Sequence, residues 1–448
     1  MSELKTIARH AGSVLAGQLA TMAFGVTDTI VAGRYGQSSL AALSVGSAIY
    51  MSIYVGLMGV LQPLLPAWAE LHGARQHSAL GRSVRQALYL GLILVGLGIF
   101  GLLNPGQLLN WGDVPDALRT EITTYLALLA LALPPALLFR MYSTLNQSLG
   151  KPLMVTWLQL GSLLLKVPLS IWFTFGGLGL PAQGLVGCAW ATLLVNYVML
   201  ALALWLLRHD ALYQPYRIWQ KPEPPHWPTI AHFARQGIPS GLAILVEVTS
   251  FTLMALFIAR QGTVAAASHQ IAANLAAVLY MVPLAIGIAT SARISFWLGA
   301  GHPLKARHAV SVGFGMVTLS ALSLAAALVL ARYVLANLYA SSPPVVELSA
   351  LLLMWVAAFH LFDGLQALAV FVLRCFRITL APLLVYCVML WGVGLYGGYR
   401  LAYLGLGPLQ ALQTPAAFWM TASVALAITS LLMWGMVWQV MRRDAPPS

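Results

Sequence analysis

Residues 238–259 read IPSGLAILVEVTSFTLMALFIA, an apolar run that contains one charged side chain, Glu247. A helix needs about 20 apolar residues to cross the hydrocarbon core of a bilayer, so this run is long enough for one crossing. The rest of the chain has the same character, because 60% of its 448 residues are hydrophobic and only 8% are charged. Soluble domains carry roughly 25% charged residues. These values exclude a soluble protein and indicate a polytopic membrane protein.

Similar apolar runs recur along the whole chain between short polar breaks. They predict spans near residues 11–33, 41–65, 86–104, 122–143, 153–175, 184–207, 238–259, 264–291, 309–331, 348–373, 379–401 and 416–441. The alternating polar and apolar pattern of transmembrane β-strands is absent. We therefore predict an all-α integral membrane protein with twelve transmembrane helices.

Basic residues gather on one side of this predicted topology, which holds most of the 24 Lys and Arg residues. Cytoplasmic loops of membrane proteins carry an excess of Lys and Arg, and an even number of crossings returns the chain to its starting side. We therefore expect both termini in the cytoplasm. The net charge of +12 is explained by these loops, so nucleic acid is not an expected partner.

The one long predicted connection, residues 208–237, contains Pro, Trp and basic residues that suit a linker along the inner membrane surface. It separates an N-terminal lobe, residues 1–207, from a C-terminal lobe, residues 238–448, with six predicted spans in each. Short motifs recur in both lobes at a constant offset, AGRYG at 32–36 against IARQG at 258–262 and HGA at 72–74 against LGA at 298–300. Two copies with six spans each keep the same orientation. This predicts two bundles related by a pseudo-two-fold axis along the membrane normal, with a cleft between them.

Three of the 12 acidic residues lie inside predicted spans: Asp28, Glu247 and Asp363. A charge at the bilayer centre costs about 2.5–3.5 kcal/mol on insertion scales, so each acid needs a cavity, a partner or a proton. At a rise of about 1.5 Å per residue, Asp363 lies about 16 Å along its helix from Arg374, and Glu247 lies farther from any basic residue in its run. Both acids of the C-terminal lobe therefore lack a local cation.

Two such acids are expected either to hold protons or to share a bound metal cation such as Na⁺. A close pair of carboxylates does not readily hold two negative charges, so a bound H⁺ or Na⁺ can be exchanged for a cationic substrate. This chemistry predicts an antiporter. The alternative is that each acid is a structural hydrogen-bond acceptor between helices.

Asp28 differs from the other two acids in having a candidate cationic partner, because Lys166 lies deep in a span of the same lobe and can pair with it. Such a pair would be a neutral structural bridge. Asp28 is therefore either an ion or proton site of the N-terminal lobe or the partner of Lys166. In the other lobe, His360 lies three residues before Asp363 and can share a proton with it on one helix face.

The segments that carry these acids resemble the multidrug and toxic compound extrusion (MATE) transporters, in their NorM-like branch. The similar stretches are FGVTDTIVAGRYGQSSLAALSVG at 24–46, LVEVTSFTLMALFIARQG at 245–262, SHQIAANLAAVLYMVPLAIG at 268–287 and FDGLQALAVFVLR at 362–374. They look like the first, seventh, eighth and tenth spans of that family, in the expected order. The resemblance implies that Glu247 and Asp363 are coupling-cation carboxylates and that Asp28 is the acid of the N-terminal lobe.

The fifth span departs from the family pattern. LLLKVPLS at 163–170 places Lys166 and Ser170 where relatives usually show Asn. A fixed ammonium near Asp28 would repel a second cation, so we expect coupling to depend mainly on the C-terminal lobe. Gln270 and Asn274 on the eighth span are candidate neutral ligands there.

The resulting hypothesis is a multidrug efflux antiporter of the bacterial inner membrane, which exports organic cations or amphiphilic drugs in exchange for inward Na⁺ or H⁺ by alternating access. We expect a monomer in the lipid bilayer with no resident cofactor. The alternative is a lipid or oligosaccharide flippase of similar architecture, which would need a cationic cavity for phosphates. Enzyme activity is not expected, because His269, Gln270 and His360 form no known catalytic spacing.

Overall fold

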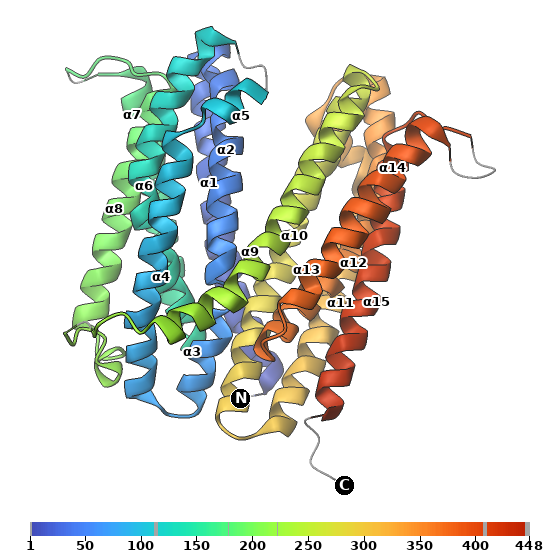
Figure 1. Cartoon of the computed structure of the whole chain (residues 1–448). Helices are drawn as coiled ribbons and strands as arrows, with labels where there is room; N and C mark the ends of the chain where they lie inside the picture. Colours follow the sequence, from blue (N-terminus) through green and yellow to red (C-terminus); the bar gives the residue numbers. More distant parts are fainter. Residues whose placement is uncertain (1, 112–114, 178, 222, 406–409, 444–448) are drawn as a thin grey trace. The chain divides into compact units, whose positions relative to one another are not determined.

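The computed structural model describes residues 2–111, 115–177, 179–221, 223–405 and 410–443, and these residues form helices joined by short connections (Figure 1). Twelve helical stretches are long and apolar enough to cross a membrane. Each overlaps one predicted span, and the described residues contain no β-strand beyond an isolated bridge between Gly177 and Leu180. The predicted all-α class with twelve spans is confirmed.

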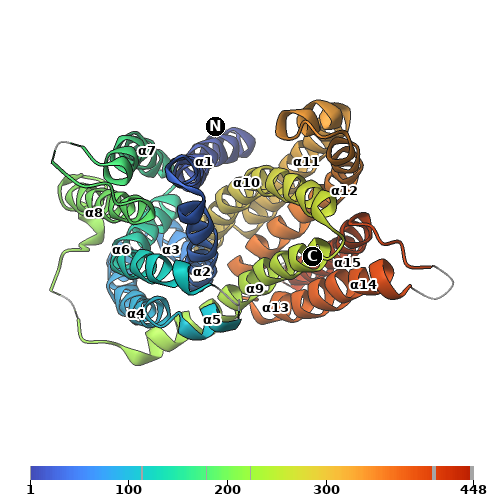
Figure 2. The ribbon, with the colours of Figure 1, turned by 90° about the horizontal axis from the view of Figure 1, so that it is seen from above.

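Residues Ala16–Gly241 form one compact unit, called the first unit below. Its helices are the later part of α1 (Glu3–Tyr35), α2 (Gln37–Leu61), α3 (Leu64–Gly73), α4 (His77–Leu103), α5 (Gly106–Trp111), α6 (Asp116–Ser148), α7 (Pro152–Phe175), α8 (Leu185–His209), and the start of α9 (Trp227–Ala259). Helix α6 is the centre of this unit, because it packs against α2, α3, α4, α7 and α8 (Figure 2). It is also the most buried span of the unit.

Residues Met1–Leu15 and Leu242–Ser448 form the second unit. It holds the start of α1, the rest of α9, α10 (Thr263–Gly299), α11 (Pro303–Tyr339), α12 (Pro343–Cys375), α13 (Leu380–Tyr386), η2 (Cys387–Tyr396), α14 (Gly397–Tyr399), η3 (Arg400–Leu404) and α15 (Ala416–Arg443). Helix α12 is central, because it packs against α10, α11 and α15. Both α6 and α12 are the fourth of six spans, which agrees with the predicted internal repeat.

The two units differ at their boundaries from the predicted lobes, because α1 and α9 each contribute to both. At the start of α1, the Glu3 carboxylate accepts two hydrogen bonds from the Arg293 guanidinium, at 2.6 and 3.0 Å, and one from Trp297 Nε1 at 3.0 Å. These bonds hold the first residues of α1 in the second unit. In α9, Gly237 and Gly241 have no side chain to separate this helix from the backbone of α2, which keeps the start of α9 in the first unit.

The predicted linker is shorter than expected and is docked on the first unit. The α8 helix continues to His209 and α9 begins at Trp227, so the predicted range of 208–237 overlaps both helices. Between them, the Arg85 guanidinium of α4 donates to the Arg217 carbonyl at 2.8 Å and pairs with the Glu223 carboxylate at 2.7 Å. The connection is therefore fixed against α4.

Helices α7 and α8 approach each other closely at Gly187. A Cβ atom at this position would lie 2.4 Å from the Phe173 carbonyl carbon and 2.5 Å from the Thr174 amide nitrogen, both of which are backbone atoms. Glycine therefore allows the two helices to touch near the Lys166 side chain.

We expect Gly187→Ala to destabilise the first unit by about 1–3 kcal/mol, because overpacking forces the backbone to move. Thermal unfolding of the purified protein, followed by tryptophan fluorescence, measures the effect. Gly161→Ala in α7 is the matched control, since nothing lies within 4 Å of a Cβ atom there. Equal melting temperatures for the two variants would contradict this account of the α7–α8 contact.

Candidate cation-binding site

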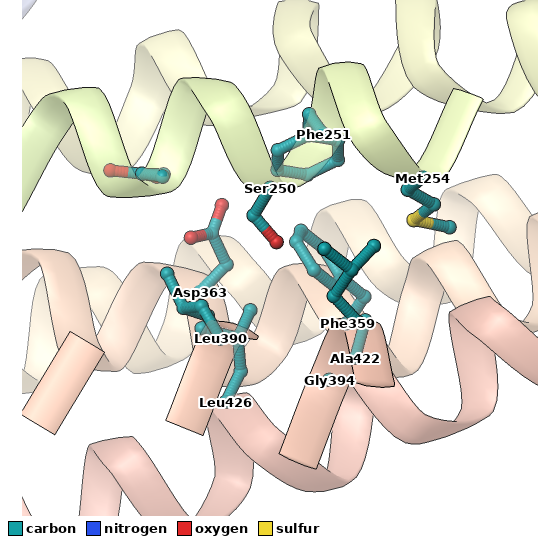
Figure 3. A pocket seen from close by; sticks show the side chains of 11 residues that line it. Ser250, Phe251, Met254, Phe359, Asp363, Leu390, Gly394, Ala422 and Leu426 are labelled. Carbon is teal, nitrogen blue, oxygen red and sulfur yellow. The ribbon is translucent and has the colours of Figure 1, made fainter. Parts of the chain in front are cut away.

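A small pocket in the second unit lies among α9, α12, η2 and α15, and two carboxylates line it. Glu247 comes from α9 and Asp363 from α12. The other lining residues are Ser250, Phe251, Met254, Phe359, Leu390, Gly394, Leu395, Ala422 and Leu426 (Figure 3). The cavity volume of about 20 Å³ accommodates one water-sized group and is far below that of a drug-binding pocket.

Asp363 is buried, with 5% of its surface exposed, and its bonded partner is neutral. Gln366 Nε2 donates to Asp363 Oδ1 at 3.0 Å, and the Tyr386 hydroxyl donates to Gln366 Oε1. Gln366 lies one turn after Asp363 on α12, and Tyr386 ends α13, so two helices fix the carboxylate. This chain of donors orients Asp363 without neutralising its charge.

Neither pocket carboxylate is in direct contact with a basic side chain of the described residues. Within the described ranges, no ion pair joins Glu247 or Asp363 to a Lys or Arg side chain. The guanidinium of Arg374, on the same helix as Asp363, lies over the Phe371 ring at 5.0 Å from its centroid, and it acts on Glu247 electrostatically without contacting it. Burial of an unpaired charge is costly, so the pocket favours an added proton or small cation.

An aromatic wall borders the two carboxylates. The rings of Phe251, Phe359 and Trp419 meet edge to face, with centroids 5.4 to 6.2 Å apart. Figure 3 shows that Phe251 and Phe359 face each other beside the space into which the Asp363 carboxylate and the Ser250 hydroxyl point. A wall of this kind excludes water and strengthens the electrostatic attraction for a bound cation.

The eleventh span adds an irregular backbone to the pocket. Its central part, η2, is a π-helix, a rare conformation that is often found at functional sites. Leu390, Gly394 and Leu395 of η2 line the pocket, and the Thr421 hydroxyl donates to the Gly394 carbonyl at 2.8 Å. This π-helix and the roles of Ser250, Gln366 and Tyr386 were not predicted from the sequence. The one indication in the sequence was the spacing of Gln366, which follows Asp363 by three residues and so lies on the same face of the helix.

The candidate auxiliary ligands Gln270, Asn274 and His360 are not among the residues that line this pocket. Gln270 and Asn274 are exposed on α10, where Gln270 Nε2 donates to Asn274 Oδ1 at 3.3 Å. His360 is buried, but its Nε2 has no hydrogen-bond partner and it is not among the lining residues. The reason is helical geometry: Phe359 and Asp363, four residues apart, face the pocket, and His360 lies about 100° around the helix from Phe359.

Asp28 of the first unit has the cationic partner that Glu247 and Asp363 lack. Lys166 Nζ on α7 lies 2.7 Å from Asp28 Oδ1 on α1, and the Ser170 hydroxyl donates to the same oxygen at 3.3 Å. Lys166 is fully buried and Asp28 is 8% exposed. Of the two alternatives for Asp28, the structure therefore contains the ion pair with Lys166.

Known proteins share this architecture along the whole chain. The family model MatE matches residues 14–172 and 239–399. A probable multidrug resistance protein NorM of Aromatoleum aromaticum is 37% identical over 434 residues, which cover 97% of this chain and 94% of that protein. The multidrug resistance protein PmpM of Pseudomonas aeruginosa is 33% identical over 89% of this chain and 84% of its own length. The crystal structure of the eukaryotic MATE transporter AtDTX14 has a TM-score of 0.87 at 19% identity, and the match covers 99% of this chain and 98% of that one.

The buried pair in the first unit predicts strong energetic coupling between its two side chains. We expect Asp28→Asn and Lys166→Met each to cost about 3–5 kcal/mol of stability, because each leaves an uncompensated buried charge. The double variant should lose much less than the sum of the two single losses, since it buries no net charge. Thermal unfolding of the four proteins measures the coupling, and additive losses would contradict the pairing.

Proposed function

The chain belongs to the MatE family, and from this premise we propose that it exports organic cations or amphiphilic drugs from the cell in exchange for inward Na⁺ or H⁺. Members of this family are transporters, and the curated relatives above are named as multidrug resistance proteins. The chain is a multi-pass membrane protein. As part of the proposal, it lies in the bacterial inner membrane with both termini in the cytoplasm, works as a monomer, and needs no resident cofactor.

The observation that carries the coupling proposal is the pocket that contains Glu247 and Asp363 without a Lys or Arg partner. A monovalent cation that binds there balances one of the two negative charges and favours the arrangement of α9, α12 and η2 in which the pocket is closed. The pocket admits a small ion and excludes a drug, so substrate binding must favour a different arrangement of these helices. Ion and substrate then stabilise alternative states and exclude each other, which is the requirement for exchange.

A flippase for phosphate-bearing lipids is the weaker proposal. Such a protein would need an available cation for the phosphate group, and Lys166 was the residue that favoured this alternative. In the structure Lys166 is fully buried and pairs with Asp28, so its charge is already used. Because Lys166 already neutralises Asp28, the unpaired acids of the second unit are the better candidates for binding the coupling ion.

We expect Glu247→Gln and Asp363→Asn each to reduce the export of a cationic dye to the background level, because either change removes half of the charge that binds the coupling ion. Dye efflux from cells that lack their own pumps, at equal expression, measures this. Glu347→Gln is the matched control, since Glu347 is an exposed acid at the start of the same helix as Asp363. Unchanged export by either pocket variant would contradict the assignment.

The coupling ion is identified by transport into liposomes that contain the purified protein. A sodium gradient alone should drive dye transport if the two carboxylates hold Na⁺, and a pH gradient alone should drive it if they hold H⁺. Transport that responds to neither gradient, with a protein that still binds dye, would overturn the antiport proposal.

A further inference from the structure

The ammonium group of Lys166 is surrounded by oxygen atoms from two other helices. Nζ lies 2.7 Å from Asp28 Oδ1 on α1, 3.0 Å from the Cys188 carbonyl and 2.6 Å from the Thr192 hydroxyl, the last two on α8. An ammonium group has three N–H donors, so all three find an acceptor. The Lys166 side chain is 0% exposed, and no donor is left for water or substrate.

These oxygens form the kind of shell that a hard metal cation uses. A carboxylate, a main-chain carbonyl and a hydroxyl are neutral or anionic oxygen ligands, and together they carry one negative charge. The charge of one ammonium balances it. The shell is held independently of Lys166, because the Thr192 hydroxyl also contacts the Cys188 carbonyl at 3.0 Å and Ser170 donates to Asp28.

We propose that the Lys166 ammonium permanently occupies a monovalent-cation site in the first unit and thereby excludes a free cation from it. The sequence left two alternatives for Asp28, an ion or proton site and a partner of Lys166, and the residues around Asp28 favour the second. The acid is neutralised by a charge that is covalently attached to α7. It cannot leave the site during a transport cycle.

One consequence concerns coupling and rests on the proposed function. The second unit holds two carboxylates without a cation, whereas the first unit holds one carboxylate with a fixed cation. Inward movement of the coupling ion is therefore assigned to the second unit alone. The occupancy of the first site by Lys166 is a separate claim, which a binding measurement tests without any transport.

A simple structural ion pair and a tethered cation look alike while Lys166 is present. They differ when the side chain is shortened. If the oxygen shell is a cation site, Lys166→Ala leaves both the negative charge and the space for a small ion with water. Lys166→Met leaves the charge but fills the space with an apolar side chain of similar length, which makes it the matched control.

The experiment measures binding of ²²Na⁺ to the purified full-length protein in detergent. All variants carry Glu247→Gln and Asp363→Asn, so that the second unit does not contribute. We expect no Na⁺ binding with Lys166 intact, about one saturable site per chain after Lys166→Ala, and no site after Lys166→Met or after Lys166→Ala with Asp28→Asn. A protein with Lys166→Ala that binds no Na⁺ would overturn the proposal. So would Na⁺ binding that Asp28→Asn removes while Lys166 is present.

Folding of the alanine variant supplies a second readout. If Na⁺ replaces the ammonium, the melting temperature of the Lys166→Ala protein should be higher in NaCl than in choline chloride, because a bound ligand stabilises the folded state. The Lys166→Met protein should show no such difference. Equal melting temperatures in the two salts, or equal loss of folded Lys166→Ala protein in both, would count against the cation site. Neither readout depends on export, so failure of the antiport proposal would be seen separately.

Discussion

A carboxylate inside a bilayer must be neutralised, and the two units of this chain meet that requirement in opposite ways. In the first unit, the Lys166 ammonium lies 2.7 Å from Asp28 and is bonded to two further oxygens. In the second unit, Glu247 and Asp363 line one pocket, and Asp363 receives only a neutral donor from Gln366. The charge of the buried acid is therefore balanced by an attached ammonium in one unit, and the proposed function assigns this role to a mobile cation in the other.

The sequence predicted those features that depend on composition and on distance along one helix. The twelve spans follow from apolar length, and the absence of an ion pair at Glu247 and Asp363 among the described residues agrees with their separation from Arg side chains on the same helices. The chain from Asp363 through Gln366 to Tyr386 was not predicted, because it joins α12 to α13. The π-helix η2 was missed for a similar reason, since backbone conformation inside an apolar run leaves no clear pattern. Gln270 and Asn274 do not line the pocket, and the sequence indicated the span that carries them but not the face of the helix on which they lie.

The boundaries of the two units also depend on contacts between distant parts of the chain, which the sequence did not predict. The bond between Glu3 and Arg293 joins residues at distant positions in the chain, and the contact of Gly237 with α2 depends on close backbone packing. As a result, α1 and α9, the first spans of the two repeats, each contribute residues to both units. These two helices also carry Asp28 and Glu247. Each repeat therefore places an acid on the helix that is shared, so neutralisation of that acid affects a segment that belongs to both units.

The difference in neutralisation also predicts where conformational change is concentrated. The Lys166 ammonium stays at Asp28 whatever the ion concentration. The net charge of this site, around which α1, α7 and α8 pack, therefore does not change. Under the proposed function, the pocket of Glu247 and Asp363 has at least two states, one with a bound cation and one without, and each favours its own packing of the surrounding helices. The pocket includes the π-helix η2, a rare conformation that is often found at functional sites. If both acids were exchangeable, either unit could initiate the change. With Lys166 in place, the proposed mechanism assigns the start of the change to the second unit.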